Sequence, residues 1–236
     1  MANYIVIAAS SGIGQATVAE LRAAGHSVFT TARDSAKITP DMALDATDFD
    51  AVDAAFAAAV TQLGPLDGAV NCSGSLLLRS AHLTSKAQFD GVIGASLTTA
   101  FATVRAAGKH ITAGGSVVLV SSAAALSGMA NHEAIAAAKA GIIGLTLSAA
   151  ASYAPANLRF NAVAPGLTET PLTAQITGNE TSRKFSEGMH ALGRLGSAGD
   201  IARAITFLLD PRNSWITGQV LGVDGGLAHV RPKLKA

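Results

Sequence analysis

The chain has 236 residues, of which 49% are hydrophobic and 14% charged, and its formal net charge at pH 7 is +1. This length and apolar content can supply a large core, so we expect one folded domain over residues 1–236 and exclude intrinsic disorder. A charge this close to zero offers no basic surface, so we expect neither nucleic acid nor a membrane as a partner.

The cysteine content and the N-terminus indicate the compartment. The single cysteine, Cys72, excludes an internal disulfide and fits a reducing environment. No basic segment and apolar leader precede the first strand, so we predict no signal peptide and a cytoplasmic location. Residues 134–154 form the most apolar long stretch, but they contain Lys139 and many alanines. We interpret them as a helix buried in a protein interface rather than as a membrane span.

The first strand leads into a turn of small residues. Residues 4–7 are an apolar run typical of a buried parallel strand. Alanines and serines follow at 8–11, and then Gly12 and Gly14 precede a helix that begins at Gln15. Free N–H groups and the helix dipole favour an anion at such a turn, and the missing side chains let a pyrophosphate approach the backbone. Alone the pattern is weak, because a mere tight connection has the same sequence.

Strand-like and helix-like runs alternate along the rest of the chain. Further strands are predicted at residues 26–31, 42–44, 66–70, 116–120, 158–163 and 219–223. Further helices are predicted at residues 48–62, 88–111, 133–153 and 199–209. Gly25 is predicted to follow the end of the first helix, and Asp48 to cap the second. Such alternation indicates right-handed βαβ units, and hence an α/β fold with a parallel sheet and helices on both faces.

Residues 167–189 are the least regular stretch. They follow the carboxyl end of a predicted strand, where ligands bind in folds of this kind. Because long loops are usually functional or disordered, we expect a lid on the substrate side with its hinge at residues 165–166. The alternative is a plain surface loop.

Several short segments, each weak alone, have the order and spacing of one protein family. They are residues 8–14, 71–74, 121–122, 136–141, 161–166, 217–220 and 223–226. Over nearly its whole length the chain therefore resembles the short-chain dehydrogenases/reductases. The resemblance implies a doubly wound Rossmann-type sheet of seven parallel strands in three αβα layers, and an NAD(P) cofactor. It also implies a homodimer or homotetramer assembled through two long helices, here residues 88–111 and 133–153.

The resemblance also implies which residues hold the dinucleotide. They are Ala8, Ser10, Ser11, Gly12, Ile13, Gly14, Arg33, Asp45, Ala46, Asn71, Ser73, Lys139, Pro165, Gly166, Thr168 and Thr170. Family members usually have glycine where Ala8 stands, so we expect a slightly different turn there. Asp45 and Ala46 match the pair at the adenine. Asn71 and Ser73 match the segment beside the adenosine ribose, although Asn71 could simply close the fourth strand.

The residues after the second strand bear on the choice of cofactor. NAD-binding relatives typically carry an acidic residue where Ala32 stands, and it bonds the ribose 2′-hydroxyl. Here the position is neutral and Arg33 follows, whose guanidinium can pair with a 2′-phosphate. We therefore predict NADP(H) in preference to NAD. The alternative is a solvated Arg33 with Asp34 turned inward.

The catalytic positions depart from the family pattern. In the family a serine polarises the carbonyl, a tyrosine passes the proton, and a lysine lowers the tyrosine pKa and holds the nicotinamide ribose. Ser122 and Lys139 stand at the serine and lysine positions. However, Ile135 stands where tyrosine is expected, and Ser96 where a supporting asparagine is. Isoleucine cannot transfer a proton, and general acid–base catalysis is worth roughly 10² to 10⁴ in rate.

Three interpretations remain open. His132, three residues before Ile135, could supply the proton as a third catalytic residue, although it could equally be a capping or surface histidine. A quinone or conjugated carbonyl could need little acid help, so that Ser122 suffices. Finally, the protein could bind NADP(H) without turnover, as a sensor or a subunit of a complex. We predict an oxidoreductase acting on the CH–OH group of a small molecule, or on NADPH with a quinone acceptor. No metal site is predicted, because His132 lacks a second histidine at helical spacing.

Overall fold

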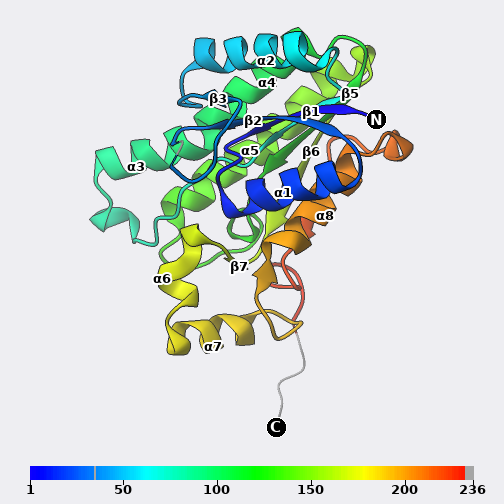
Figure 1. Cartoon of the computed structure of the whole chain (residues 1–236). Coiled ribbons are helices and arrows are strands. Elements are labelled where there is room, and N and C mark those ends of the chain that lie inside the picture. The colour runs from blue at the N-terminus through cyan, green and yellow to red at the C-terminus, as the bar shows by residue number, and fades with distance from the viewer. Residues whose placement is uncertain (35, 232–236) are drawn as a thin grey trace.

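Seven parallel strands form the centre of the fold. They are β1 Asn3–Ile7, β2 Ser27–Ala32, β3 Met42–Ala43, β4 Gly68–Asn71, β5 Gly115–Val120, β6 Leu158–Pro165 and β9 Val220–Val223. Their order in the sheet is β3-β2-β1-β4-β5-β6-β9, which confirms the predicted Rossmann-type α/β class (Figure 1). The strand order reverses beside β1, so a crevice forms at the carboxyl ends of β1 and β4.

The structure is a computed structural model, and it describes residues 1–34 and 36–231. The predicted domain span of 1–236 also includes residues 35 and 232–236, which lie outside the described part. Every predicted strand is present. The last strand before the lid continues beyond its predicted end at residue 163, because Pro165 still pairs with Val223 of β9. The chain therefore leaves the sheet at Gly166.

Alternate residues of each strand face different layers. In β1, Ile5 and Ile7 pack into one hydrophobic core, and Tyr4 and Val6 pack into the other. This alternation follows from the geometry of a strand, whose successive side chains point to opposite faces. Because both faces are buried, the strands are continuous apolar runs, and this is the pattern that predicted them.

Helices cover both faces of the sheet. α1 Gly12–Ala23 and α8 Ala198–Leu209 lie on one face, and α2 Phe49–Leu63, α4 Thr99–His110 and α5 Glu133–Tyr153 lie on the other (Figure 1). The two predicted helix-end signals are confirmed. Gly25 follows α1 with a φ of +80°, and the Asp48 carboxylate accepts the N–H groups of Asp50 and Ala51 at 2.9 and 3.1 Å.

The long helical region predicted at 88–111 contains an irregularity. It consists of α3 Lys86–Ile93, a π-helical turn Gly94–Thr98, and α4. The π-helical turn includes Ser96, whose buried hydroxyl has no hydrogen-bond partner among the described residues. Such turns interrupt α-helices frequently at functional sites.

The other long helix, α5, has the predicted bounds. With the short helical turn after it, it is long and apolar enough to cross a membrane by length and composition alone. It packs along β6 and also contacts β5. Since 44% of its apolar window is buried inside the protein, we interpret α5 as a core helix.

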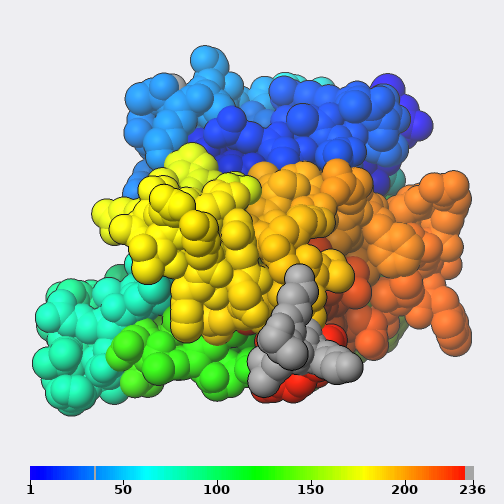
Figure 2. Space-filling view, turned by 90° about the horizontal axis from the view of Figure 1, so that it is seen from below, coloured from blue at the N-terminus to red at the C-terminus, as the bar shows by residue number. Residues whose placement is uncertain are grey.

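Residues 167–189, which we call the lid, are more regular than predicted. The lid contains β7 Thr168–Glu169, α6 Ala174–Thr177 and α7 Glu180–Met189, and β7 pairs with β8 Gly196–Ser197. The expectation of an irregular stretch was therefore wrong. The start of α7 is stabilised by Asn179, whose side chain accepts the Ser182 N–H at 2.9 Å. Seen from below, the lid (yellow) lies between the N-terminal residues in blue and the middle of the chain in green (Figure 2).

Candidate functional site

A cavity of about 810 Å³ lies where the carboxyl ends of the strands meet the start of α1, α5 and the lid. Most of the predicted site residues line it, although they come from distant parts of the sequence. They are Ala8, Ser10, Ser11, Gly12, Ile13, Arg33, Asp45, Ala46, Ser73, Ser122, His132, Lys139, Pro165, Gly166, Thr168 and Thr170. Gly14 and Asn71 are the predicted residues that do not line it.

The turn between β1 and α1 has the shape of an anion-binding site. Ala8 has a φ of +59°, in the left-handed region where glycine is usual. Gly14 is packed so closely that a Cβ there would lie 2.5 Å from the Ala8 carbonyl oxygen. Ser11 Oγ accepts the Gly14 N–H at 3.0 Å and so caps α1. The other N–H groups of the first turn lack intrahelical acceptors, and with the helix dipole they favour an anion.

The lid rests on this turn. A Cβ on Gly12 would lie 2.9 Å from both Cβ and Cγ2 of Thr170. Glycine at this position therefore allows the lid to approach the backbone of α1. The contact brings the first and the last predicted cofactor segments together across one side of the cavity.

Asn71 supports the cavity wall without facing the cavity. Its Nδ2 donates to the Thr99 carbonyl at 2.8 Å and to the Thr103 hydroxyl at 2.7 Å, and its Oδ1 accepts the Ser73 N–H at 2.8 Å. All three bonds are internal, so the side chain ties the end of β4 to α4. This geometry corresponds to the role of closing the fourth strand.

One end of the cavity carries positive charge. Arg33 and Lys37 both line it and are exposed. The sequence analysis did not predict Lys37 as a site residue, although a second basic residue four positions after Arg33 could have indicated it. Asp45 lies nearby, and hydrogen bonds from the Thr47 N–H and hydroxyl, followed by the charge of Arg33, hold its pKa below the ordinary value. Asp34 does not line the cavity and accepts an N–H group two residues further along, so it does not turn inward.

Ser122, Ile135 and Lys139 lie together at the other end, which we call the Ser122 end. Ser122 Oγ accepts the Ala124 N–H at 3.1 Å, which leaves its own proton free to donate to a ligand. Lys139 lies one helical turn after Ile135, and its Nζ donates to the Val120 carbonyl at 2.7 Å. No carboxylate of the described chain bonds this amine, and burial lowers the pKa of Lys139 to about 8.

An apolar side chain occupies the position where the resemblance expects tyrosine. Ile135 is 4% exposed and packs with Val92 and Ala138. The chain has two tyrosines, and the structure describes both. Tyr4 is buried in β1 and Tyr153 ends α5, and neither lines the cavity. No phenol of this chain therefore reaches the Ser122 end.

His132 precedes α5 and faces the same cavity as Ser122. Its Nδ1 lies 2.8 Å from the Ala130 carbonyl oxygen. Because a carbonyl only accepts hydrogen bonds, the bond places a proton on Nδ1. Nε2 then remains for a ligand.

Further apolar side chains line the cavity. Besides Ile135 they are Leu76, Leu78, Met129, Leu172, Ile176 and Leu227. They lie in loops and in the lid, where the sequence has no periodic pattern to reveal them. Cys72 also lines the cavity, and burial raises the pKa of its thiol to about 12, so it stays protonated. Within the described ranges, no group of three His, Cys, Asp or Glu side chains is placed to hold a metal ion.

Comparison with known proteins identifies the family. A family model described as Enoyl-(Acyl carrier protein) reductase matches residues 7–228. The 3-oxoacyl-[acyl-carrier-protein] reductase FabG of Thermotoga maritima is 33% identical, over 94% of this chain and 96% of its own. The structure of a short-chain type dehydrogenase/reductase from Mycobacterium ulcerans matches with a TM-score of 0.92 and 28% identity, over 98% of this chain and 91% of that one. The chain belongs to the short-chain dehydrogenase/reductase family.

Among solved structures of this family, ElxO with NADP bound has a TM-score of 0.88 and 29% identity, over 96% of this chain and 99% of that one. ElxO with a tyrosine replaced by phenylalanine, with NADPH bound, has a TM-score of 0.89 and 30% identity over the same shares of the two chains. Both of these structures hold a bound nicotinamide dinucleotide.

The burial of Lys139 generates a prediction about stability. Folding lowers its pKa from the ordinary 10.5 to about 8, so between these values the unfolded chain binds more protons than the folded one. The free energy of unfolding of the wild type should therefore rise with pH in this window, relative to Lys139→Met, which lacks the group. Urea unfolding of both proteins at about pH 7.5 and about pH 9 measures the difference. Equal pH slopes for the two proteins would contradict the prediction.

Proposed function

We propose that the chain is an NADP(H)-dependent oxidoreductase that reduces quinones or conjugated carbonyl compounds. One observation carries the proposal: a single cavity joins an anion-binding turn and two cations to a serine hydroxyl, a histidine and a buried lysine among apolar side chains. When bound, NADPH supplies a hydride from its nicotinamide ring. The chain's own residues then have to bind the cofactor, orient the acceptor and help to protonate it.

The cavity suits a phosphorylated dinucleotide. The turn at Gly12 lacks a side chain where a pyrophosphate approaches the backbone, and the start of α1 favours its charge. Arg33 and Lys37 supply positive charge where a ribose 2′-phosphate fits, and the guanidinium can bond it through two N–H groups. ElxO holds NADPH with one tyrosine replaced by phenylalanine. This supports NADPH binding by a relative that carries Ile135 in place of a phenol.

Ser122 and Lys139 have the roles of orienting groups. The Ser122 hydroxyl donates its free proton to the oxygen of the acceptor, because its lone pair already accepts the Ala124 N–H. The Lys139 amine holds the hydroxyls of the nicotinamide ribose and adds positive charge near the acceptor oxygen. Both groups lower the energy of a developing negative charge without needing to transfer a proton.

The substrate class follows from the missing phenol and from the apolar wall. A simple ketone concentrates negative charge on one oxygen during hydride addition, so it depends on a strong local acid. A quinone or an enone spreads this charge over a conjugated system, and His132 or water suffices to protonate it. Within the described chain, Lys139 and His132 are the charged or titratable side chains at the Ser122 end other than Cys72. A neutral, flat and apolar acceptor fits that environment.

An NADP(H)-binding protein without turnover is the second candidate. Ile135 favours it, since this side chain is buried among apolar neighbours where the family's proton donor stands. Such a protein would act as a sensor or as a subunit of a complex. It would bind NADPH in the same cavity, so the two candidates differ only in whether the bound cofactor then transfers its hydride.

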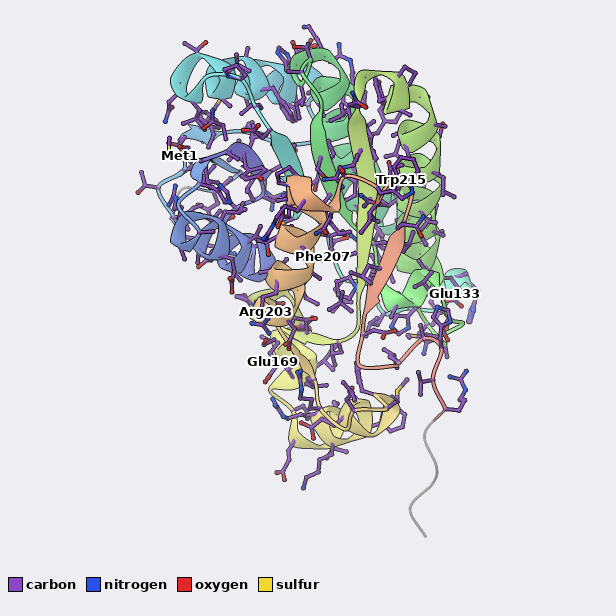
Figure 3. All side chains as sticks on the ribbon, turned by 90° about the vertical axis from the view of Figure 1, so that its right-hand side faces the viewer. Met1, Glu133, Glu169, Arg203, Phe207 and Trp215 are labelled. Atoms are coloured by element: carbon purple, nitrogen blue, oxygen red, sulfur yellow. The ribbon has the colours of Figure 1, made fainter. Side chains whose placement is uncertain are left out.

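We also propose that two or four copies assemble through α4 and α5. Both helices expose a large apolar side chain, Phe101 at 49% and Leu147 at 53%. The exposed face of α5 otherwise carries small residues such as Ala137, Ala140 and Gly144, which permit close packing of a second helix. Figure 3 shows α5 rising from Glu133 along the edge of the molecule.

The assembly proposal predicts the effect of a charge on this face. Leu147→Glu should reduce the mass in solution to that of one 23.6 kDa chain, because the carboxylate cannot be buried against an apolar partner. Sedimentation of the wild type and the variant measures this. As a control, Phe185→Glu on the exposed lid should leave the mass unchanged. A monomeric wild type would contradict the proposal.

The cofactor proposal predicts a selective loss of affinity. Arg33→Ala should weaken NADPH binding by about tenfold or more and leave NADH binding nearly unchanged, because only NADPH carries the 2′-phosphate. Lys37→Ala should show the same selectivity with a smaller effect. Isothermal titration calorimetry measures both, with Lys109→Ala as a control for a surface cation far from the cavity. Equal losses for the two cofactors would argue against a 2′-phosphate site.

The substrate proposal predicts a distinct pattern of turnover. Loss of nicotinamide absorbance should be observed with quinones and enones, but not with simple ketones. His132→Gln should slow quinone reduction modestly, since water can replace the imidazole. Ile135→Tyr should introduce measurable ketone reduction, because a phenol then stands one turn before Lys139. Tight NADPH binding with no turnover across the panel would instead support the non-enzymatic candidate.

A further inference from the structure

His190 lies behind the cavity wall, directly after the lid helix α7. The residue is buried, with only 3% of its surface exposed. Nδ1 lies 2.6 Å from the Ser186 carbonyl oxygen, and Nε2 accepts the Leu167 N–H at 3.2 Å. A carbonyl only accepts and an amide N–H only donates, so the two bonds together require a neutral ring with its proton on Nδ1.

The bond to Leu167 holds the point where the chain leaves β6. Gly166 separates the ring from the cavity, and a Cβ on this glycine would lie 2.8 Å from His190 Nε2. Gly166 lines both the main cavity and a second cavity of about 490 Å³, which His190 also lines. The carbonyl oxygen of Leu167 accepts the Gly196 N–H at 3.0 Å. Leu167 is therefore held by a backbone bond at its carbonyl and by the imidazole bond at its amide, and the Gly166 N–H before it bonds the Val223 carbonyl at 3.2 Å.

We propose that His190 is a positioning residue for the dinucleotide. Its imidazole fixes the amide of Leu167, and thereby the segment 165–168 that forms this part of the cavity wall. Because the same ring bonds the Ser186 carbonyl, it also links the backbone of this segment to helix α7. The inference rests on the proposed function only in taking NADP(H) as the ligand of the cavity.

The charged groups around the second cavity are engaged elsewhere. Arg194 and Arg203 bond the Asp200 carboxylate at 2.8 and 2.7 Å. Asp224 accepts backbone N–H groups of the following turn at 2.9 and 2.8 Å. Figure 3 shows Arg203 on α8, the helix that starts at the base of the lid. In the described chain, none of these groups bonds the imidazole, so its partners are the backbone atoms of two lid segments.

Two substitutions separate the two bonds. The amide oxygen of His190→Gln reaches the Nε2 position and can accept the Leu167 N–H, but the bond to Ser186 is lost. The amide nitrogen of His190→Asn reaches the Nδ1 position and keeps the Ser186 bond, but the Leu167 bond is lost. Each variant loses one hydrogen bond, so their melting temperatures should be similar. His110→Asn, which removes a bond to Asp53 between α2 and α4, is the control for loss of a histidine bond elsewhere.

The first readout is hydrogen exchange of the Leu167 amide without any ligand. His190→Asn should accelerate exchange by about tenfold, whereas His190→Gln and His110→Asn should stay close to the wild type. The second readout is NADP⁺ binding by calorimetry, where His190→Asn should bind several-fold more weakly than His190→Gln. Equal exchange and equal affinity in the two His190 variants would overturn the proposal. If the wild type binds no NADP⁺ at all, the proposed cofactor is wrong, and hydrogen exchange alone then decides whether His190 holds Leu167.

Discussion

The backbone turn between β1 and α1 is the constraint on which the site depends. A side chain on Gly14 would collide with the Ala8 carbonyl, and Ala8 itself adopts a positive φ, a conformation that costs an L-residue about 1–2 kcal/mol. This turn directs the start of α1 toward the carboxyl ends of the neighbouring strands. The cavity end with Arg33 and Lys37, the contact with the lid and the Ser122 end are all arranged around this turn.

The buried amine of Lys139 is the second determining feature. In the family pattern a phenol stands one helical turn before this amine, and here Ile135 stands there instead. The amine therefore has a backbone carbonyl as its partner, and burial makes its charged form less favourable. Under the proposed function, a site of this kind binds and orients the cofactor and the acceptor but has weak means of proton transfer. Whether the protein turns over an acceptor therefore depends on how far that acceptor can itself delocalise the negative charge that develops on hydride addition.

The sequence predicted the parts of the molecule that follow from periodicity and local signals. The strands were predicted because both their faces are buried. The end of α1 and the start of α2 were predicted because Gly25 and Asp48 act on the helix turn directly beside them. The helices of the lid were missed, since they are short and α7 has no buried residues to produce an apolar pattern. The role of His190 could not be predicted, because its partners lie in segments that only the tertiary fold brings near. For Asn71 the sequence offered two roles, and only its bonds to Thr99 and Thr103 favour closing the fourth strand.

The contact between the lid and the first turn has a consequence for how the two segments can vary. Thr170 packs directly against Gly12, so a methyl group at position 12 finds no room unless Thr170 or the start of α1 shifts. The size of the residue at position 12 and the position of segment 167–173 relative to α1 are therefore coupled.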